Sequence, residues 1–402
     1  MVFIGTNSGS LQAPSTMMTR LFQLLLLTTF VASADQANLE ARVTGRDFPS
    51  IFQAWNGATP VSGRDADAML AMHDLAFIHP SMIGLKAQEA FEGMAFSFTP
   101  SSLAGAKARR TKLLGRNPHL ILLAEIRYRD APRGFLPEDA VWWKRDAYGQ
   151  FLMGWAEGGY RLLDVANASW QAQVATRAKA VLDTGVFDGV MLDWWNDDEP
   201  HVALIRRVRE AIGAEALILV NSNDRTIPKT SSEINGLYME CYRSATPKDW
   251  QRISETLRWA ETNLRTPRVN CIETWYHHSR QDFQLMRAVT ALSLTHSDGY
   301  CLFADPNELP TPDHLHDWYD FWSKGLGQPK KPSFKRPDGA WERMFSGGTV
   351  IYNPPVGSNM TVHFDAPHQS RATGRTGTEH KVAANDGDIF FVPNQTQPSE
   401  QR

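Results

Sequence analysis

Acidic residues end several of the short apolar runs in this 402-residue chain. The five acids in this position are Glu125, Asp193, Glu240, Glu273 and Asp305. A carboxylate inside an apolar strand is costly unless it points into a polar opening. In parallel α/β folds that opening lies at the carboxyl ends of the strands, where ligands bind. Two carboxylates facing each other there, one protonated and one ionised, are what hydrolysis of a glycosidic bond requires.

Three of these acids are candidate catalytic groups: Asp193, Glu240 and Glu273. Each also has a plainer interpretation. Asp193 can cap the turn that follows its strand, and Glu240 or Glu273 can be a hydrogen-bonding partner that shapes the pocket. Asp305, which precedes a proline, is also typical of a turn.

The residues around these acids are suited to binding sugars. Indole and phenol rings offer flat apolar faces on which a sugar ring can stack, and side-chain amides can bind hydroxyl groups. The predicted substrate-binding residues, besides Glu125 and Asp305, are Gln53, Trp55, Trp194, Trp195, Asn221, Asn223, Tyr242 and Trp275. We therefore expect an oligosaccharide or polysaccharide substrate.

No metal and no other cofactor is expected. His277 and His278 are adjacent and do not share a face, and the chain has no Cys/His zinc spacing and no serine nucleophile elbow. The acidic run 196–199 could hold calcium, but an acidic helix N-terminus explains it equally well. A metal-dependent hydrolase that uses this run therefore stays open as a third interpretation.

The elements that must position the acids follow a repeating order. Eight short apolar runs alternate with helix-like segments between residues 51 and 305. This pattern predicts an α/β protein built as a (β/α)8 TIM barrel over residues 44–327. An open doubly wound sheet is the alternative, although no Gly-rich phosphate loop follows any strand. The long aromatic connection 128–160 is too aromatic for disorder and is predicted to be functional.

Both ends of the chain differ from the barrel. Residues 330–393 read as short strands between turns, which predicts a small C-terminal all-β module of β-sandwich type. The polar tail 394–402 is expected to be disordered. At the other end, Arg20, an apolar run 21–31 and Ala32-Ser33-Ala34 predict a signal peptide over residues 1–34. A buried N-terminal helix is the alternative.

The export signal predicts a secreted or periplasmic protein, and the composition indicates which partners are not expected. The net charge of −3 gives no reason to expect nucleic acid or a membrane surface as a partner. The three cysteines, Cys241, Cys271 and Cys301, are too few for a disulfide scaffold and are expected to be buried thiols. One bridge between neighbouring strands stays open.

Several motifs resemble the bacterial glycoside hydrolases grouped as glycoside hydrolase-like family fifteen, in the α-galactosidase-type barrel superfamily. The resembling segments are 52–56 (FQAWN), 163–167 (LDVAN), 188–193 (DGVMLD) and 345–354 in the β-module. The resemblance spans residues 48–393. It implies a retaining glycosidase in which Asp193 is the nucleophile and Glu240, on the sixth strand, is the acid/base. Glu240 stands where better-known relatives carry aspartate, so Glu273 on the seventh strand remains its competitor.

The leading prediction is thus an exported glycoside hydrolase with a two-carboxylate mechanism. Its rival from another class is a non-catalytic glycan-binding barrel, in which the aromatic residues bind sugar and the acids only form hydrogen bonds. The separation of the two carboxylates distinguishes them, since a binding site needs no fixed pair.

Overall fold

A computed structural model describes residues 1–2, 38–276, 278–306 and 313–393. The predicted signal peptide, apart from its first two residues, and the predicted disordered tail lie outside the described residues. The described residues from 42 to 393 belong to one compact unit, which includes the barrel and the C-terminal sheet. Within the described residues, no helix combines the length and the apolar character needed to cross a bilayer.

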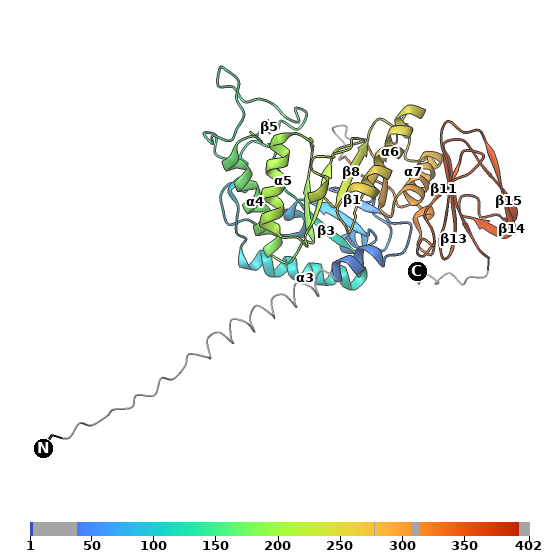
Figure 1. The fold of residues 1–402 in the computed structure, drawn as a ribbon, viewed down its shortest axis with the longest axis horizontal. Helices are drawn as coiled ribbons and strands as arrows, with labels where there is room; N and C mark the ends of the chain where they lie inside the picture. The colour runs from blue at the N-terminus through green and yellow to red at the C-terminus, as the bar shows by residue number, and fades with distance from the viewer. Residues whose placement is uncertain (3–37, 277, 307–312, 394–402) are drawn as a thin grey trace. The chain divides into compact units, whose positions relative to one another are not determined.

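Eight parallel strands form the central sheet (Figure 1). In order they are β1 (Phe52–Ala54), β2 (Leu75–Ile78), β3 (Ile121–Glu125), β6 (Gly189–Leu192), β7 (Leu217–Asn221), β8 (Gly236–Cys241), β9 (Cys271–Trp275) and β10 (Tyr300–Ala304). A parallel bridge between Ile51 and Cys301 brings the first and last strands together, so the sheet is nearly closed. The TIM-barrel prediction is confirmed, and the open doubly wound sheet is wrong.

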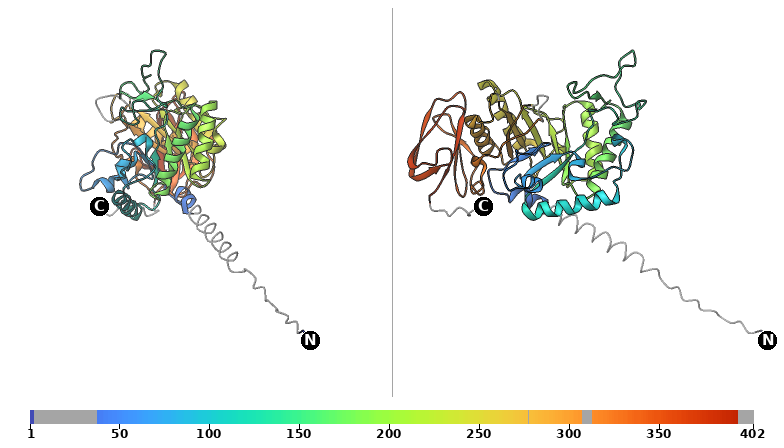
Figure 2. Two further views of the ribbon diagram at one scale, coloured as in Figure 1. Left: turned by 90° about the vertical axis from the view of Figure 1, so that its left-hand side faces the viewer. Right: turned by 180° about the vertical axis from the view of Figure 1, so that it is seen from behind.

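Helices connect the strands and cover the outside of the barrel (Figure 2). They are α2 (Ala66–Leu70), α3 (Pro100–Arg116), α4 (Ala168–Asp183), α5 (Glu199–Ile212), α6 (Pro247–Asn263) and α7 (Phe283–His296). Short 3-10 turns are η1 (Pro80–Ile83), η2 (Glu92–Met94), η3 (Ser231–Glu233) and η4 (Asp320–Trp322). The first turns are capped by side chains such as Asp198 before α5 and Thr246 before α6, which satisfy free backbone N–H groups.

Helix α4 is capped by Asn167, whose side chain accepts hydrogen bonds from the backbone of Ser169 and Trp170. The segment 314–324, after β10, contains the turn η4. His314, at the start of this segment, has a left-handed backbone conformation with φ of 59°.

The C-terminal strands form a six-stranded antiparallel sheet (Figure 1). The strands, in sheet order, are β11 (Phe334–Lys335), β12 (Trp341–Met344), β13 (Gly348–Asn353), β16 (Asp386–Phe391), β14 (Met360–Ser370) and β15 (Thr376–Val382). The sheet packs on helix α7, where Arg287 binds Asp386 at 2.7 Å. A side chain at Gly387 would collide with Ala291, so this close approach requires glycine.

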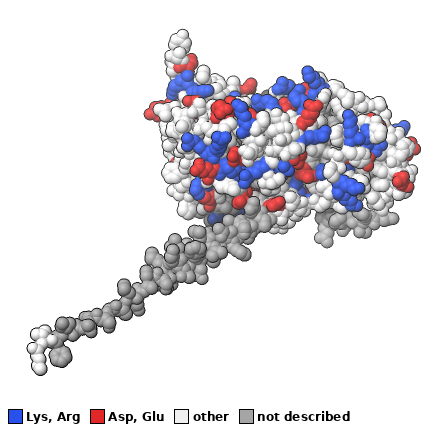
Figure 3. Space-filling model, in the orientation of Figure 1, with Lys and Arg blue, Asp and Glu red and all other residues white. Residues whose placement is uncertain are grey.

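Charge and cysteines agree with the composition. Basic and acidic side chains are interspersed on the face in Figure 3, as expected for a small net charge. Cys241, Cys271 and Cys301 are all buried free thiols in the barrel strands. The prediction of buried thiols is confirmed.

Candidate active site

A pocket of about 220 Å³ opens at the carboxyl ends of the barrel strands. Its lining residues are Trp55, Glu125, Arg127, Asp130, Trp155, Tyr160, Asp193, Trp194, Glu240, Asp313 and His314. Five of these residues come from the set predicted from sequence: Trp55, Glu125, Asp193, Trp194 and Glu240. They come from strand ends far apart in the chain, because a parallel barrel gathers those ends at one face.

Strand β6 places Asp193 at the pocket. Every residue of β6 is buried, and Asp193 follows it directly, partly exposed. The backbone of Gly189 lies so close to Leu217 that a Cβ atom there would be 2.1 Å from the Leu217 carbonyl oxygen. The strand is therefore fixed against β7, and the position of Asp193 is fixed with it.

One side chain joins the two main carboxylates. Nδ2 of Asn221, at the end of β7, donates to Oδ1 of Asp193 at 2.8 Å and to Oε2 of Glu240 at 2.9 Å. Because both bonds start from one nitrogen, the accepting oxygens lie within about 5.7 Å of each other. The backbone N–H of Asn223 donates to Oδ1 of Asn221 at 3.0 Å and so fixes the orientation of the amide.

The two carboxyl groups differ in proton affinity. Burial raises the pKa of Asp193 to about 6, although the Asn221 hydrogen bond opposes this shift. Burial also raises the pKa of Glu240 to about 8, with the charge of Asp193 adding to the effect. Near pH 7 Asp193 is therefore mostly ionised and Glu240 mostly protonated. The pair holds one base and one acid at neutral pH.

Glu273 does not line the pocket. Its side chain, on β9, is 0% exposed, and it accepts hydrogen bonds from the hydroxyl of Tyr238 and, at 2.9 Å, from Nδ1 of His314. Its two strong partners and its burial leave no face toward a substrate. The imidazole of His314, in contrast, reaches the pocket wall.

Aromatic residues supply the apolar walls. Trp194 is 42% exposed, and its left-handed backbone, with φ of 53°, turns the ring out of the strand direction. The guanidinium of Arg129 lies 4.5 Å from its ring centroid. On another side, the ring of Trp55 lies 5.1 Å from that of His314.

Comparison with known proteins identifies the fold. No family model matches the sequence, and no curated protein does. An α-amylase from Malbranchea cinnamomea is similar with a TM-score of 0.52 at 12% identity, covering 88% of this chain and 97% of the other. A noncanonic maltogenic α-amylase from Thermotoga neapolitana gives 0.51 at 10% identity, with coverages of 86% and 99%. A cyclic α-maltosyl-(1→6)-maltose hydrolase from Arthrobacter globiformis gives 0.51 at 10%, with coverages of 87% and 98%. This chain shares their fold.

Some predicted residues lie outside this pocket. Trp195 is 0% exposed and donates from Nε1 to Thr230, so the prediction that it offers a stacking face needs correction. Asp305 is buried against Arg280, an ion pair that holds the segment after β10, and it is absent from the pocket lining. Both side chains were predicted to bind a ligand, but in the structure each binds another residue of the protein instead.

The remaining predicted residues are near the strand ends but do not line the pocket. Gln53 is buried and donates to the carbonyl of Trp55 at 3.0 Å. The rings of Tyr242 and Trp275 lie 5.8 Å apart and pack on each other. Asn223 acts through its backbone on Asn221, as described above.

The sequence interpretation missed six lining residues: Arg127, Asp130, Trp155, Tyr160, Asp313 and His314. Four of them lie in or beside the long connection 128–160, which the sequence marked as functional without assigning residues. The two ends of that connection pair as the antiparallel strands β4 (Asp130–Ala131) and β5 (Arg161–Leu162), and its residues Trp155 and Tyr160 line the pocket. The signal that could have found them was the density of Arg, Trp and Tyr there.

The acidic run after β6 serves helix α5. Asp198 caps the helix and binds His201, while Asp197 accepts from the backbone and hydroxyl of Thr230. Among the described residues, no group of three or more His, Cys, Asp or Glu side chains is arranged to hold a metal ion. The capping interpretation of the run therefore describes its contacts.

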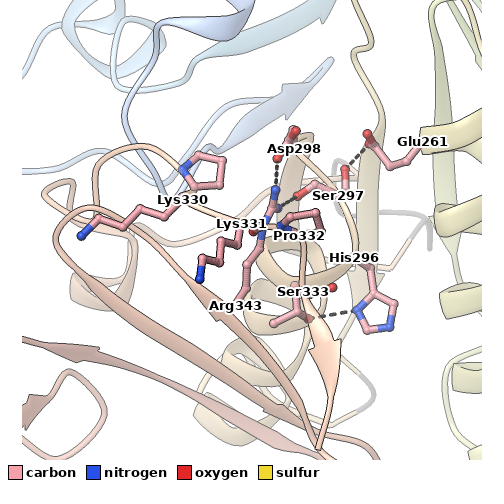
Figure 4. A pocket seen from close by; sticks show the side chains of 11 residues that line it. Glu261, His296, Ser297, Asp298, Lys330, Lys331, Pro332, Ser333 and Arg343 are labelled. Atoms are coloured by element: carbon pink, nitrogen blue, oxygen red, sulfur yellow. Dashed lines mark hydrogen bonds and ion pairs between the residues drawn. The ribbon is translucent and has the colours of Figure 1, made fainter.

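A larger pocket of about 450 Å³ lies where the C-terminal sheet meets the barrel (Figure 4). Its lining includes Glu261, which accepts a hydrogen bond from Ser297, and Arg343, which binds Asp298. It shares no lining residue with the pocket of Asp193 and Glu240. Glu261 and Arg343 therefore each bind a neighbouring side chain at this junction.

Proposed function

We propose that the protein is a glycoside hydrolase that acts with retention of configuration. The observation that carries this proposal is the Asn221 amide, which donates to both Asp193 and Glu240. The pKa of Glu240 is raised further than that of Asp193, which suits Glu240 to the acid role and Asp193 to the role of nucleophile. The two oxygens that share this donor lie at most about 5.7 Å apart, which is compatible with a retaining pair, whose carboxyl groups are typically about 5–5.5 Å apart.

In the proposed mechanism, Asp193 attacks the anomeric carbon while Glu240 gives its proton to the leaving oxygen. The glycosidic C–O bond breaks as the ester bond to Asp193 forms. Glu240, now ionised, takes a proton from water, and the resulting hydroxide displaces Asp193 and restores both groups. Glu273 is less suited to the acid role because its burial keeps it from the leaving oxygen.

The fold supports a carbohydrate substrate. The similar solved structures are named as two α-amylases and a maltosyl-maltose hydrolase. The motifs that resemble glycoside hydrolase-like family fifteen support the same class. The proposal itself rests on the pocket, since the identity to these structures is only 10–12%.

The test is hydrolysis of a broad panel of polysaccharides and aryl glycosides by wild type, Asp193→Asn and Glu240→Gln. We expect both variants to remain folded and to lose about 10²–10⁴-fold in kcat/KM or more. Azide should restore activity to Glu240→Gln and yield a glycosyl azide. For the wild-type protein, NMR of the first product formed should show the same anomeric configuration as the substrate. A wild-type protein that binds glycans but cleaves none would favour the binding barrel. Full activity of Glu240→Gln would return the acid role to Glu273.

We also propose export, from the apolar run 21–31 and the Ala32-Ser33-Ala34 sequence. Expression of the full chain in a bacterial host should yield a mature protein beginning at Asp35 outside the cytoplasm. N-terminal sequencing of the fractionated protein checks this. An uncleaved protein in the cytoplasmic fraction would contradict it.

A further inference from the structure

Glu273 and His314 form an ion pair beneath the pocket that no catalytic step described above uses. Nδ1 of His314 lies 2.9 and 3.0 Å from the two carboxylate oxygens of Glu273. Their side chains are 1% and 0% exposed. The Tyr238 hydroxyl is a further donor to Glu273, so the carboxylate is held from two sides.

The backbone fixes His314 in place. His314 has a φ of 59°, a left-handed conformation that is uncommon for residues other than glycine and persists only where the surroundings impose it. Asp305 imposes it: its N–H donates to the Leu315 carbonyl at 2.8 Å, and its own side chain is tied to Arg280. The ring is further packed against Trp55.

This arrangement keeps the imidazole charged. Burial alone would lower the pKa of His314, but the charges of Glu273 and Glu240 and the Glu273 hydrogen bond raise it to about 10. His314 therefore carries a positive charge throughout the neutral range. The charged imidazole ring is held in place, because its Nδ1 is bound to Glu273 and its backbone is fixed.

We propose that Glu273 and His314 are positioning residues that hold a fixed positive charge beside Glu240 and thereby set the pH range in which Glu240 can serve as acid and base. This inference rests on the proposed function for its catalytic meaning. The effect of the His314 charge on the pKa of Glu240 can be measured whether or not the protein hydrolyses a glycoside. The proposed role of Glu273 differs from that of a catalytic acid.

Other charged groups also act on the pair. The titratable and charged groups that face Glu240 or His314 from the surrounding elements are Glu125, Arg127, Asp130, Asp193, Tyr238, Glu273, Asp313 and His316. Among the charges acting on Glu240, that of His314 is the largest and lowers its pKa, while those of Asp193 and Glu273 raise it. Removal of the His314 charge should therefore raise the pKa of Glu240 whether or not Glu273 stays ionised.

His314→Asn isolates the charge. The Asn amide can stand where Nδ1 donates to Glu273, and asparagine tolerates the left-handed backbone better than most residues. Glu273→Gln is the second variant. Without Glu273 burial drives His314 to its neutral form, so Glu240 loses the same positive charge and its pKa should again rise, by a smaller amount.

The measurement is a pH titration of the protein labelled with ¹³C at the Glu carboxyl carbon. Glu240→Gln assigns the Glu240 signal by its disappearance. We expect His314→Asn to move the Glu240 midpoint upward by about one pH unit or more, as an adjacent opposite charge typically does. Glu261→Gln, which removes a half-buried carboxyl that lines the other pocket, is the matched control and should leave the Glu240 midpoint in place.

The outcomes separate the two proposals. An unchanged Glu240 midpoint in both His314→Asn and Glu273→Gln would overturn the positioning role, whatever the activity. A shifted midpoint in a protein that hydrolyses nothing would uphold the ion pair and reject the glycosidase. Where hydrolysis is measurable, the basic limb of kcat/KM should move upward with the midpoint, and a loss of activity without this shift would mark a merely structural pair.

Discussion

Asp193 and Glu240 accept hydrogen bonds from the same nitrogen atom, Nδ2 of Asn221. The shared donor limits their separation and stabilises the ionised form of each carboxyl group. Both groups are nevertheless raised in pKa, because burial outweighs the hydrogen bond. Their different neighbours leave Asp193 mostly ionised and Glu240 mostly protonated at neutral pH, as two-carboxylate chemistry needs.

The pH dependence of hydrolysis should be bell-shaped. Asp193 must be ionised to attack, so kcat/KM should fall below a pH of about 6. Glu240 must be protonated to act as acid, so it should fall again above about 8. Initial rates at low substrate between pH 4 and 10 give the two limbs, which belong to the coupled pair. Activity that still rises above pH 9 would contradict the acid role of Glu240.

Asn221→Ala should move both limbs of the pH–rate profile to higher pH. The Asn221 hydrogen bond lowers the pKa of Asp193 and of Glu240, so its loss raises both. Stability should also fall by about 1–3 kcal/mol, because two partly buried carboxyl groups lose a donor. The same pH–rate measurement and urea unfolding check these effects.

Asn223→Gly is the matched control for Asn221→Ala. Glycine keeps the left-handed backbone, with φ of 52°, and the N–H that donates to Asn221. Its pH limbs should match wild type. Equal limb shifts in the two variants would show that the loop, and not the Asn221 amide, controls the pair.

Glu240→Gln should stabilise the protein at pH 8 more than at pH 5. The folded pKa of Glu240 is raised, so between its unfolded value and about 8 the unfolded chain binds fewer protons, and stability falls as pH rises. Glutamine removes this loss, which we expect to be on the order of 2 kcal/mol. Urea unfolding of both proteins at pH 5 and 8 measures it. If wild type and Glu240→Gln differ in unfolding free energy by the same amount at pH 5 and pH 8, the pKa of Glu240 is not raised in the folded protein.

The adjacent tryptophans should respond in opposite ways. Trp194→Asn removes an exposed ring while tolerating the left-handed backbone, so glycan affinity should drop roughly tenfold, or about 1.4 kcal/mol, with little loss of stability. Trp195→Ala empties a fully buried site and should cost about 3–5 kcal/mol. Isothermal titration and urea unfolding of each variant check the pair. Weaker glycan binding by a still-folded Trp195→Phe would place Trp195 at the ligand after all.

Asp305→Asn should destabilise the fold by about 2–3 kcal/mol without moving the limbs of the pH–rate profile. Its carboxylate is buried and paired with Arg280, whose charge would lose this partner. Asp317→Asn is the control, since Asp317 lies 3.4 Å from the same guanidinium but its side chain is 30% exposed, and exposed pairs contribute about 0–1 kcal/mol. Urea unfolding distinguishes them. Equal losses of stability in Asp305→Asn and Asp317→Asn would show that the burial of the Asp305 carboxylate does not determine its contribution to stability.

The sequence alone determined the barrel and part of its pocket. Apolar runs bounded by turns specify buried parallel strands, and an acid at the end of such a run must emerge at the barrel mouth. This is why Asp193, Glu240 and Glu125 were found from the sequence. The same rule placed Glu273 and Asp305 at strand ends without indicating whether a neighbour would bind them.

Only the tertiary structure decided those pairings. The partners of Glu273 and Asp305, His314 and Arg280, lie 41 and 25 residues away in sequence, and no local pattern links them. His314 itself follows the last barrel strand, β10, and was not among the site residues predicted from the sequence. Local propensity fixes where a side chain leaves its strand, whereas the folding of distant segments over the barrel mouth fixes which charge it meets there.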